Sequence, residues 1–420
     1  MLRNIALSNN NKSITPYKIN IMRFTGPITK NTFKAATLAL ALFATSFSAC
    51  KKSADEELAP VEASNTVETV ISASDLNETA AKGSYHLKDY TLKGVFKFPI
   101  GAAVVKELLE KPEYANTLIK DFSRLSSESD FKWGSLHPSK DKYTFAKADA
   151  IVEFAQKHNM KVHGHTLLWA HDGNEPKWVK EFQGDEKAWE QLLKDHIFTV
   201  MKHFKGKVQS WDVVNEVVKE GGKYTNSIWY RKLGKDYVIK AFKYAQQADP
   251  SAKLFLNDYG QEYGGKKMKE LLNIVDEAKK QGVTIHGMGF QLHTVVRMDA
   301  APITQSLKLA ADKGLLVHIS ELDISVKHGM PKTFELPDAL AKAQGKKFKE
   351  IVQGYLDVVP KKQQWGITTW GVSDKTSYFN KGYANADHDY PLLFGKDYLA
   401  KWAYRGFIEA GLGRYPGSFQ

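Results

Sequence analysis

Short apolar runs alternate with longer segments of helical periodicity from about Tyr85 onward. A short run bounded by turn residues predicts a buried strand, and apolar positions three or four apart predict an amphipathic helix. Eight strands alternating with helices over about 330 residues favour a single (β/α)8 TIM barrel. The predicted strands are 98–104, 123–127, 161–169, 208–216, 253–258, 287–293, 316–324 and 365–372. The clearest predicted helices are 149–158, 189–204, 237–248, 266–281 and 339–358.

Polar and aromatic residues gather where the predicted strands end. The active site of a (β/α)8 barrel lies at the carboxyl ends of its strands, so these residues are candidates for one common site. A polar group at nearly every strand end is harder to obtain by chance than any single member of the set. In chain order the residues are Glu128, Lys132, His163, His165, Trp169, Asn215, Glu216, Asn257, Asp258, Tyr259, Gln291, His293, Glu321, Asp323, Trp370 and Asp374.

Two of the predicted strands each deliver a glutamate after an apolar run. They read VQSWDVVNE, which ends at Glu216, and LLVHISELDI, which contains Glu321. Burying a charged group at the end of an apolar run costs free energy unless the group is paired. A glutamate in such a position therefore suggests that it has a chemical function. Hydrolysis of a glycosidic bond needs one carboxyl group to protonate the leaving oxygen and another to meet positive charge at the sugar carbon. A single strand-end glutamate is commonly a surface residue, but two of this design favour a catalytic pair.

Neighbouring residues suit supporting roles around this pair. Asn215 is placed to hydrogen-bond a sugar hydroxyl beside the reacting carbon. His293 and Asp323 are placed to form a hydrogen-bond chain that holds the second glutamate ionised and oriented. Trp169 and Trp370 offer flat apolar faces on which pyranose rings stack, although a lone tryptophan is more often a core residue.

Several motifs together resemble glycoside hydrolase family 10, the endo-β-1,4-xylanases, over about residues 92–410. They are GHTLLW, WDVVNE, ADPSAKLFLNDY, GFQLH, SELDI, GITTWGVSD and PLLF. The resemblance implies endo-hydrolysis of β-1,4-xylosidic linkages in xylan with retention of configuration, without a cofactor or a metal. It makes Glu216 the acid/base and Glu321 the nucleophile, supported by His293 and Asp323. It places these residues in the sugar subsites: Glu128, Lys132, His165, Trp169, Asn215, Gln291, His293, Trp370 and Tyr378.

The chain departs from the family pattern at sugar-contact positions. Ser129 stands where the family usually has an asparagine, and Ala170 where it usually has a histidine. Tyr378 stands where a second tryptophan is expected after WGVSD. The catalytic pair is unchanged, so hydrolysis is better supported than the identity of the sugar.

The N-terminal segment has the organisation of a secretory signal. Two lysines precede a run of small and apolar residues at 35–47, which ends in Ser48-Ala49-Cys50. This ending resembles a bacterial lipobox, in which the cysteine is acylated, and Cys50 is the single cysteine of the chain. An ordinary signal peptide with an incidental cysteine is the alternative, and translation from Met22 is an alternative start. The predicted organisation is a signal peptide at 1–49, a flexible tether at 50–82 and the catalytic barrel at 83–420.

The net charge of +12 does not indicate nucleic-acid binding. Residues 1–49 contribute six Lys or Arg and no acidic residue, which leaves +6 spread over the remainder without a basic block. We expect a monomer that acts on a polysaccharide, with no nucleic-acid partner. The lipid on Cys50 implies export and anchoring to a bacterial membrane. The acidic cluster that follows it favours the outer-membrane cell surface.

Three other interpretations remain open from the sequence. The spacing of His163 and His165 suits a metal ligand pair, with His293 and Asp374 as further ligands, and this would indicate a metal-dependent barrel hydrolase. The altered sugar-contact positions also suit a surface glycan-binding barrel that has lost turnover. They equally suit a retaining hydrolase of another β-linked glycan.

Overall fold

The computed structural model describes residues 89–326, 334–380 and 389–413. The predicted signal peptide, Cys50 and the whole of the predicted tether lie outside these residues. Among the described residues, none of the helices combines the length and the apolar character that a membrane crossing requires.

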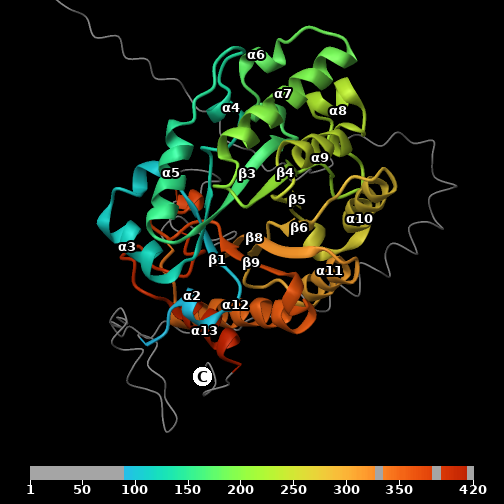
Figure 1. The fold of residues 1–420 in the computed structure, drawn as a ribbon. Coiled ribbons are helices and arrows are strands. Elements are labelled where there is room, and N and C mark those ends of the chain that lie inside the picture. The colour runs from blue at the N-terminus through green and yellow to red at the C-terminus, as the bar shows by residue number, and fades with distance from the viewer. Residues whose placement is uncertain (1–88, 327–333, 381–388, 414–420) are drawn as a thin grey trace, which may run out of the picture. The chain divides into compact units, whose positions relative to one another are not determined.

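Eight parallel strands close into a barrel, as the sequence predicts, with helices around the outside (Figure 1). Neighbours follow the order β6-β5-β4-β3-β2-β1-β9-β8, and pairing of Gly287–Phe290 with Leu316–Ile319 closes the ring. A ninth strand, β7, is a short addition that pairs with β8 alone. The strands are β1 (Ile100–Val104), β2 (Arg124–Ser127), β3 (Lys161–Trp169), β4 (Ser210–Asn215), β5 (Lys253–Asp258), β6 (Gly287–Phe290), β7 (His293–Val295), β8 (Leu316–Ser325) and β9 (Gln364–Thr369).

The barrel strands form from nearly continuous buried runs because both faces of a parallel sheet are covered. All residues of β1, β2, β4 and β6 are buried, and so are all but the first of β8. The ladders shift register between His165 and Leu168, between Asp212 and Val214, and between Ile319 and Leu322. Such irregularities re-aim side chains. The first two shifts come just before Trp169 and Asn215, and the third spans Glu321, so these irregularities lie among the residues that the sequence assigns to the site.

The helices cover the barrel, and the five that the sequence predicts are all present within a few residues of their expected bounds. Side-chain caps fix several starts: Asp185 accepts from the backbone N–H of Ala188 at the start of α7, and Ser227 accepts from Tyr230 at the start of α8. The α-helices are α2 (Leu92–Val95), α3 (Pro112–Asp121), α4 (Trp133–Leu136), α5 (Ala146–Lys157), α6 (Lys177–Lys180), α7 (Glu186–Phe204), α8 (Ile228–Leu233), α9 (Tyr237–Ala248), α10 (Gly265–Lys280), α11 (Ala301–Asp312), α12 (Asp338–Val358) and α13 (Trp402–Leu412).

Two barrel strands end three residues before their predicted limits: β9, predicted to reach 372, ends at Thr369, and the sixth strand breaks early as well. The sequence extends the sixth barrel strand from 287 to 293, but β6 ends at Phe290. Leu292 has a φ of 58°, in the left-handed region, which an extended strand does not contain. The chain therefore turns after β6 and begins a new short strand at His293, which pairs with Asp323 of β8.

The barrel interior is partly polar just below the mouth. Asp212 is 1% exposed, and its Oδ2 lies 2.9 Å from Nδ1 of His165. On its other side, Nε2 of His163 lies 3.0 Å from Oδ1, and Nδ1 of the same ring lies 2.7 Å from the Ser210 hydroxyl. Burial disfavours ionisation of Asp212, but the two histidines outweigh it and hold the pKa of this carboxyl below its usual range. A buried charged cluster of Asp212, His163 and His165 therefore lies inside the barrel, below the carboxyl ends of the strands.

Candidate active site

Glu321 lies in β8 at the carboxyl end of the barrel and is 4% exposed. Its Oε1 accepts a hydrogen bond of 3.0 Å from the Asn257 amide, and its Oε2 lies 3.2 Å from Nε2 of His293. Burial alone would raise the pKa of Glu321. The hydrogen bond from His293 and the positive charges of His165, His293 and Lys132 outweigh burial and lower it. The structure thus holds Glu321 as a carboxylate, the form that a nucleophile requires.

His293 bridges two carboxyl groups. Its Nδ1 lies 2.8 Å from Asp323 Oδ2, while its Nε2 faces Glu321. Burial disfavours the charged ring, but Asp323 and Glu321 outweigh it and raise the pKa of His293 well above its usual value. The predicted chain from Asp323 through His293 to Glu321 is therefore present in the geometry. The imidazolium fixes the orientation of Glu321 and favours its negative charge.

Glu216 directly follows β4 and is half-buried. Its Oε1 accepts from the Asn215 amide at 3.3 Å and from the Gln291 amide at 3.1 Å. Its backbone has a φ of 60°, a strained conformation for a non-glycine residue. The backbone N–H donates to Asn257 O at 3.0 Å, and its carbonyl accepts from the Thr225 hydroxyl at 2.8 Å. These contacts therefore fix both the backbone turn at Glu216 and the orientation of its carboxyl group.

The two carboxyl groups belong to one hydrogen-bonded network. The Asn257 amide that donates to Glu321 also donates to Asn215 Oδ1 at 2.8 Å. The Gln291 amide donates to the same Asn215 oxygen at 3.2 Å as well as to Glu216. Glu216 is held by amides and Glu321 by a charged imidazole, and such unequal environments allow two carboxyl groups to serve different roles.

The other predicted sugar-contact residues surround this network. The Lys132 ammonium lies 4.3 Å from the centre of the Trp169 ring. Burial lowers the pKa of Lys132, and the charges of Glu321, Glu216 and Glu128 act against it. Lys132 therefore lies within electrostatic reach of all three carboxyl groups.

Two further aromatic side chains lie against the site histidines. The Trp370 ring, 8% exposed, meets His165 edge-on with centroids 5.3 Å apart, and it lies 6.3 Å from His293. The Tyr378 ring meets His293 edge-on at 5.7 Å. Burial raises the pKa of Tyr378 well above its usual value, and the charge of Asp323 adds to this effect. Both aromatic residues therefore confine His293 as well as the space beside it.

The structure brings most of the predicted site residues into one set of contacts, whereas Asp374 is engaged elsewhere. The residues in this set are Lys132, His165, Trp169, Asn215, Glu216, Gln291, His293, Glu321, Asp323, Trp370 and Tyr378. Asn257 was recognised only as a strand-end residue, yet it is the amide that joins the two carboxyl groups. A side chain at residue 289 would obstruct it, since a Cβ on Gly289 would lie 2.1 Å from Asn257 Oδ1. The polar end of the apolar run KLFLN was its signal in the sequence. Asp212, which orients His165, gave no comparable signal because it lies inside its run.

The contacts do not favour the metal-site interpretation. His163 and His165 direct nitrogens to Asp212 and Ser210, as described above. Asp374 is engaged elsewhere: its Oδ2 lies 2.7 Å from Lys401 Nζ, and its Oδ1 accepts from Leu392 N. In the described part of the chain, no three His, Cys, Asp or Glu side chains are grouped as metal ligands.

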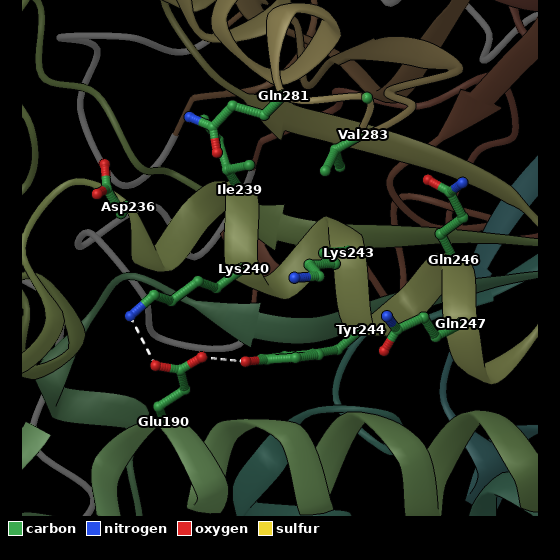
Figure 2. A pocket seen from close by; sticks show the side chains of 11 residues that line it. Glu190, Asp236, Ile239, Lys240, Lys243, Tyr244, Gln246, Gln247, Gln281 and Val283 are labelled. Atoms are coloured by element: carbon green, nitrogen blue, oxygen red, sulfur yellow. Dashed lines mark hydrogen bonds and ion pairs between the residues drawn. The ribbon is translucent and has the colours of Figure 1, made fainter. Parts of the chain in front are cut away.

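A surface pocket of about 380 Å³ lies on the outer helices, away from the strand ends (Figure 2). Three of its polar side chains pair with one another: Glu190 accepts from Lys240 at 2.7 Å and from the Tyr244 hydroxyl. Gln281 and Val283, which follow α10, complete one wall. The pocket therefore belongs to the packing of the outer helices rather than to the carboxyl network.

A closed parallel barrel that presents a coupled carboxyl pair at the carboxyl ends of its strands defines the class of barrel glycoside hydrolases. The family model described as Glycosyl hydrolase family 10 matches residues 88–410. The chain belongs to this family.

Individual relatives agree with this assignment. A Cellvibrio japonicus protein named endo-beta-1,4-xylanase Xyn10C is 32% identical over 383 residues, which cover 84% of this chain and 63% of that protein. The chain thus spans less than two thirds of this relative's length. A Dictyoglomus thermophilum beta-1,4-xylanase is 38% identical over 76% of this chain and 90% of its own length. A solved structure of a Cellvibrio japonicus xylanase10C mutant with xylopentaose is 31% identical, with a TM-score of 0.74 over 79% of this chain and 71% of that one.

Proposed function

We propose that this protein is a retaining endo-β-1,4-xylanase in which Glu321 is the nucleophile and Glu216 is the acid/base. The observation that carries the proposal is the unequal holding of the two carboxyl groups within one network. Glu321 lies between an imidazolium and an amide, which keeps it ionised. Glu216 lies beside two amides at the mouth, where a glycosidic oxygen can reach it.

In the first step, a Glu321 oxygen attacks the anomeric carbon of the sugar. The bond from that carbon to the glycosidic oxygen breaks, and Glu216 gives its proton to the departing oxygen. The product of this step is a glycosyl ester on Glu321. Glu321 loses its negative charge when it forms the ester. The His293 imidazolium still faces the negative charge of Asp323, so its positive charge remains balanced.

In the second step, the Glu216 carboxylate takes a proton from water, whose oxygen attacks the anomeric carbon and releases Glu321. Two inversions give net retention. Asn215 lies beside Glu216 and is bonded to Asn257 and Gln291, so its amide is fixed where a sugar hydroxyl next to the reacting carbon would lie.

The choice of xylan rests on the relatives. The curated relatives described above are named xylanases, and the solved relative holds xylopentaose. Lys132 and the aromatic faces of Trp169 and Trp370 suit hydroxyl and ring contacts with such a chain. Another β-linked glycan is the alternative that Ser129, Ala170 and Tyr378 motivate. Ser129 is exposed, whereas Ala170 is 1% exposed, so the two changes alter the mouth in different ways.

Proton NMR of xylohexaose during hydrolysis by the full-length chain tests this function. We expect internally cut products whose new reducing ends appear first as the β-anomer, because two inversions restore the starting configuration. Early α-anomer would contradict retention. Binding of xylohexaose without any new reducing ends would instead favour a glycan-binding barrel. Cleavage of other β-linked glycans but not of xylohexaose would assign a different substrate to the enzyme.

We also propose that the barrel is carried on a lipoprotein. The support is the sequence alone: the lipobox-like ending at Cys50, the signal-like segment before it and the polar tether at 50–82. The acidic residues after Cys50 favour the outer-membrane cell surface. A Cys50→Ala variant that remained in the membrane fraction would contradict anchoring through this residue.

A further inference from the structure

Glu216 adopts a backbone conformation that its own residue type does not favour, so the segment after it must be held by other groups. The φ of 60° turns the chain out of β4. Two of the contacts that hold this turn come from the backbone of β5 and from Thr225. The third comes from Asp258, whose Oδ2 accepts a hydrogen bond of 3.2 Å from the backbone N–H of Val218.

Asp258 is the last residue of β5 and is fully buried. Its Oδ1 accepts from the backbone N–H of Tyr259 at 2.9 Å and lies 2.8 Å from Lys267 Nζ. One carboxylate therefore connects the end of β5, the first turn of α10 and the segment that leaves Glu216.

Lys267 is an unusual partner for this position. It lies in the first turn of α10 and is 2% exposed. The partial positive charge of a helix N-terminus disfavours a cation there, so the helix itself does not stabilise the ammonium group. The group lies over the Tyr259 ring, 3.9 Å from its centre. It contacts Asp258 as an ion pair rather than through an aligned hydrogen bond.

The charge of Lys267 maintains Asp258 as an acceptor. Burial raises the pKa of Asp258 to about 6; Lys267 opposes this rise, and the charge of Glu216 adds to it. Without the lysine, burial and Glu216 would both favour a protonated Asp258, which accepts less well from Val218 N. Well-packed apolar residues commonly replace a buried ion pair without loss of stability. Stability alone therefore gives little reason for the pair at this position.

We propose that Asp258 and Lys267 are a positioning pair for the acid/base: Asp258 fixes the backbone that follows Glu216 through Val218, and Lys267 holds Asp258 in the acceptor form. This rests on the proposed function, since it assigns proton transfer to Glu216. Neither residue touches the substrate in this role. Their removal misplaces the carboxyl group that must meet the glycosidic oxygen.

The test compares two substrates that differ in their need for a proton. Xylotetraose has a poor leaving group, whereas 2,4-dinitrophenyl β-xylobioside releases a stable phenolate without protonation. In the full-length chain we expect Asp258→Asn to lower kcat/KM for xylotetraose about 100-fold, as a misplacement near 1 Å does. We expect kcat/KM for the dinitrophenyl substrate to stay within about threefold of wild type. Azide should raise kcat on this substrate, because it attacks the glycosyl ester without a base.

Further variants separate positioning from general damage. Lys267→Met, which keeps Asp258, should show the same selective loss, and it tests the proposal if Asp258→Asn does not fold. Lys267→Arg should restore much of the lost activity. Glu409→Gln is the matched control, because Glu409 is a buried ion-paired carboxyl on α13 outside the carboxyl network. Equal losses on both substrates, or no loss on xylotetraose, would overturn the proposal. A wild-type chain inactive on both would overturn the proposed function instead.

Discussion

Replacing Glu321 by alanine is expected to lower kcat/KM for xylo-oligosaccharides by about 10⁴-fold or more, because the first step has no nucleophile without it. The loss should extend to 2,4-dinitrophenyl β-xylobioside, since a good leaving group does not replace the missing attack on the anomeric carbon. Small anions fit the space that the side chain leaves. Azide should therefore restore slow turnover of the dinitrophenyl substrate and give the α-glycosyl azide after a single inversion.

Thermal melting and product NMR check this expectation. The buried control Glu409→Gln should lose stability without a comparable loss of kcat/KM, because its partners Lys349 and Arg405 lie in α12 and α13, outside the carboxyl network. A folded Glu321→Ala variant that retained substantial activity on xylotetraose would rule out the nucleophile assignment. A β-glycosyl azide from this variant would assign the nucleophile to another group.

The same residue has a pH signature that depends on His293. Because the pKa of Glu321 is lowered below its usual value, the acidic limb of kcat/KM should lie below that of an ordinary glutamate. Burial is the largest influence and acts in the opposite direction. Removing the His293 hydrogen bond and charge in His293→Ala should therefore move the acidic limb to higher pH.

The fold was largely predictable because each barrel strand is a buried run of its own. The bounds of β3 and β5 match the predicted 161–169 and 253–258, and α9 matches 237–248. The break after β6 was not predictable, since it depends on a left-handed conformation at Leu292 and on pairing of β7 with β8. Apolar periodicity contains no information about either.

The proposed catalytic pair was visible in the sequence because each glutamate ends or interrupts an apolar run. The groups that hold the pair were harder to find. Asn257 reaches Glu321 across 64 positions of the chain, and Asp258 reaches Val218 across 40. Lys267 resembles any other lysine of a helix when α10 is considered alone. Pairing of β4 with β5 brings Asp258 to the segment after Glu216, and closure of the barrel brings Asn257 to Glu321.

Replacing Glu216 by alanine is expected to affect the two steps of the reaction differently, depending on whether the leaving group needs a proton. On xylotetraose, kcat/KM should fall by about 10³-fold or more, within the range that a positioned general acid contributes. On 2,4-dinitrophenyl β-xylobioside, kcat/KM should remain close to wild type because bond cleavage needs no proton. The value of kcat should nevertheless fall, since water then attacks the glycosyl ester on Glu321 without a base. Burst kinetics and mass spectrometry of the intact protein would detect the accumulated ester.

Azide distinguishes this variant from Glu321→Ala by stereochemistry. With Glu216→Ala the glycosyl ester still forms on Glu321, so azide completes a second inversion and gives the β-glycosyl azide. Asp258→Asn should behave in the same direction with a smaller loss, because its Glu216 is present but misplaced. If Glu216→Ala lost both substrates equally, or gave the α-azide, the proton-transfer role would belong elsewhere. The Asp258–Lys267 pair would then have no acid/base to position. The stereochemistry of the glycosyl azide therefore tests both the role of Glu216 and the role of this pair.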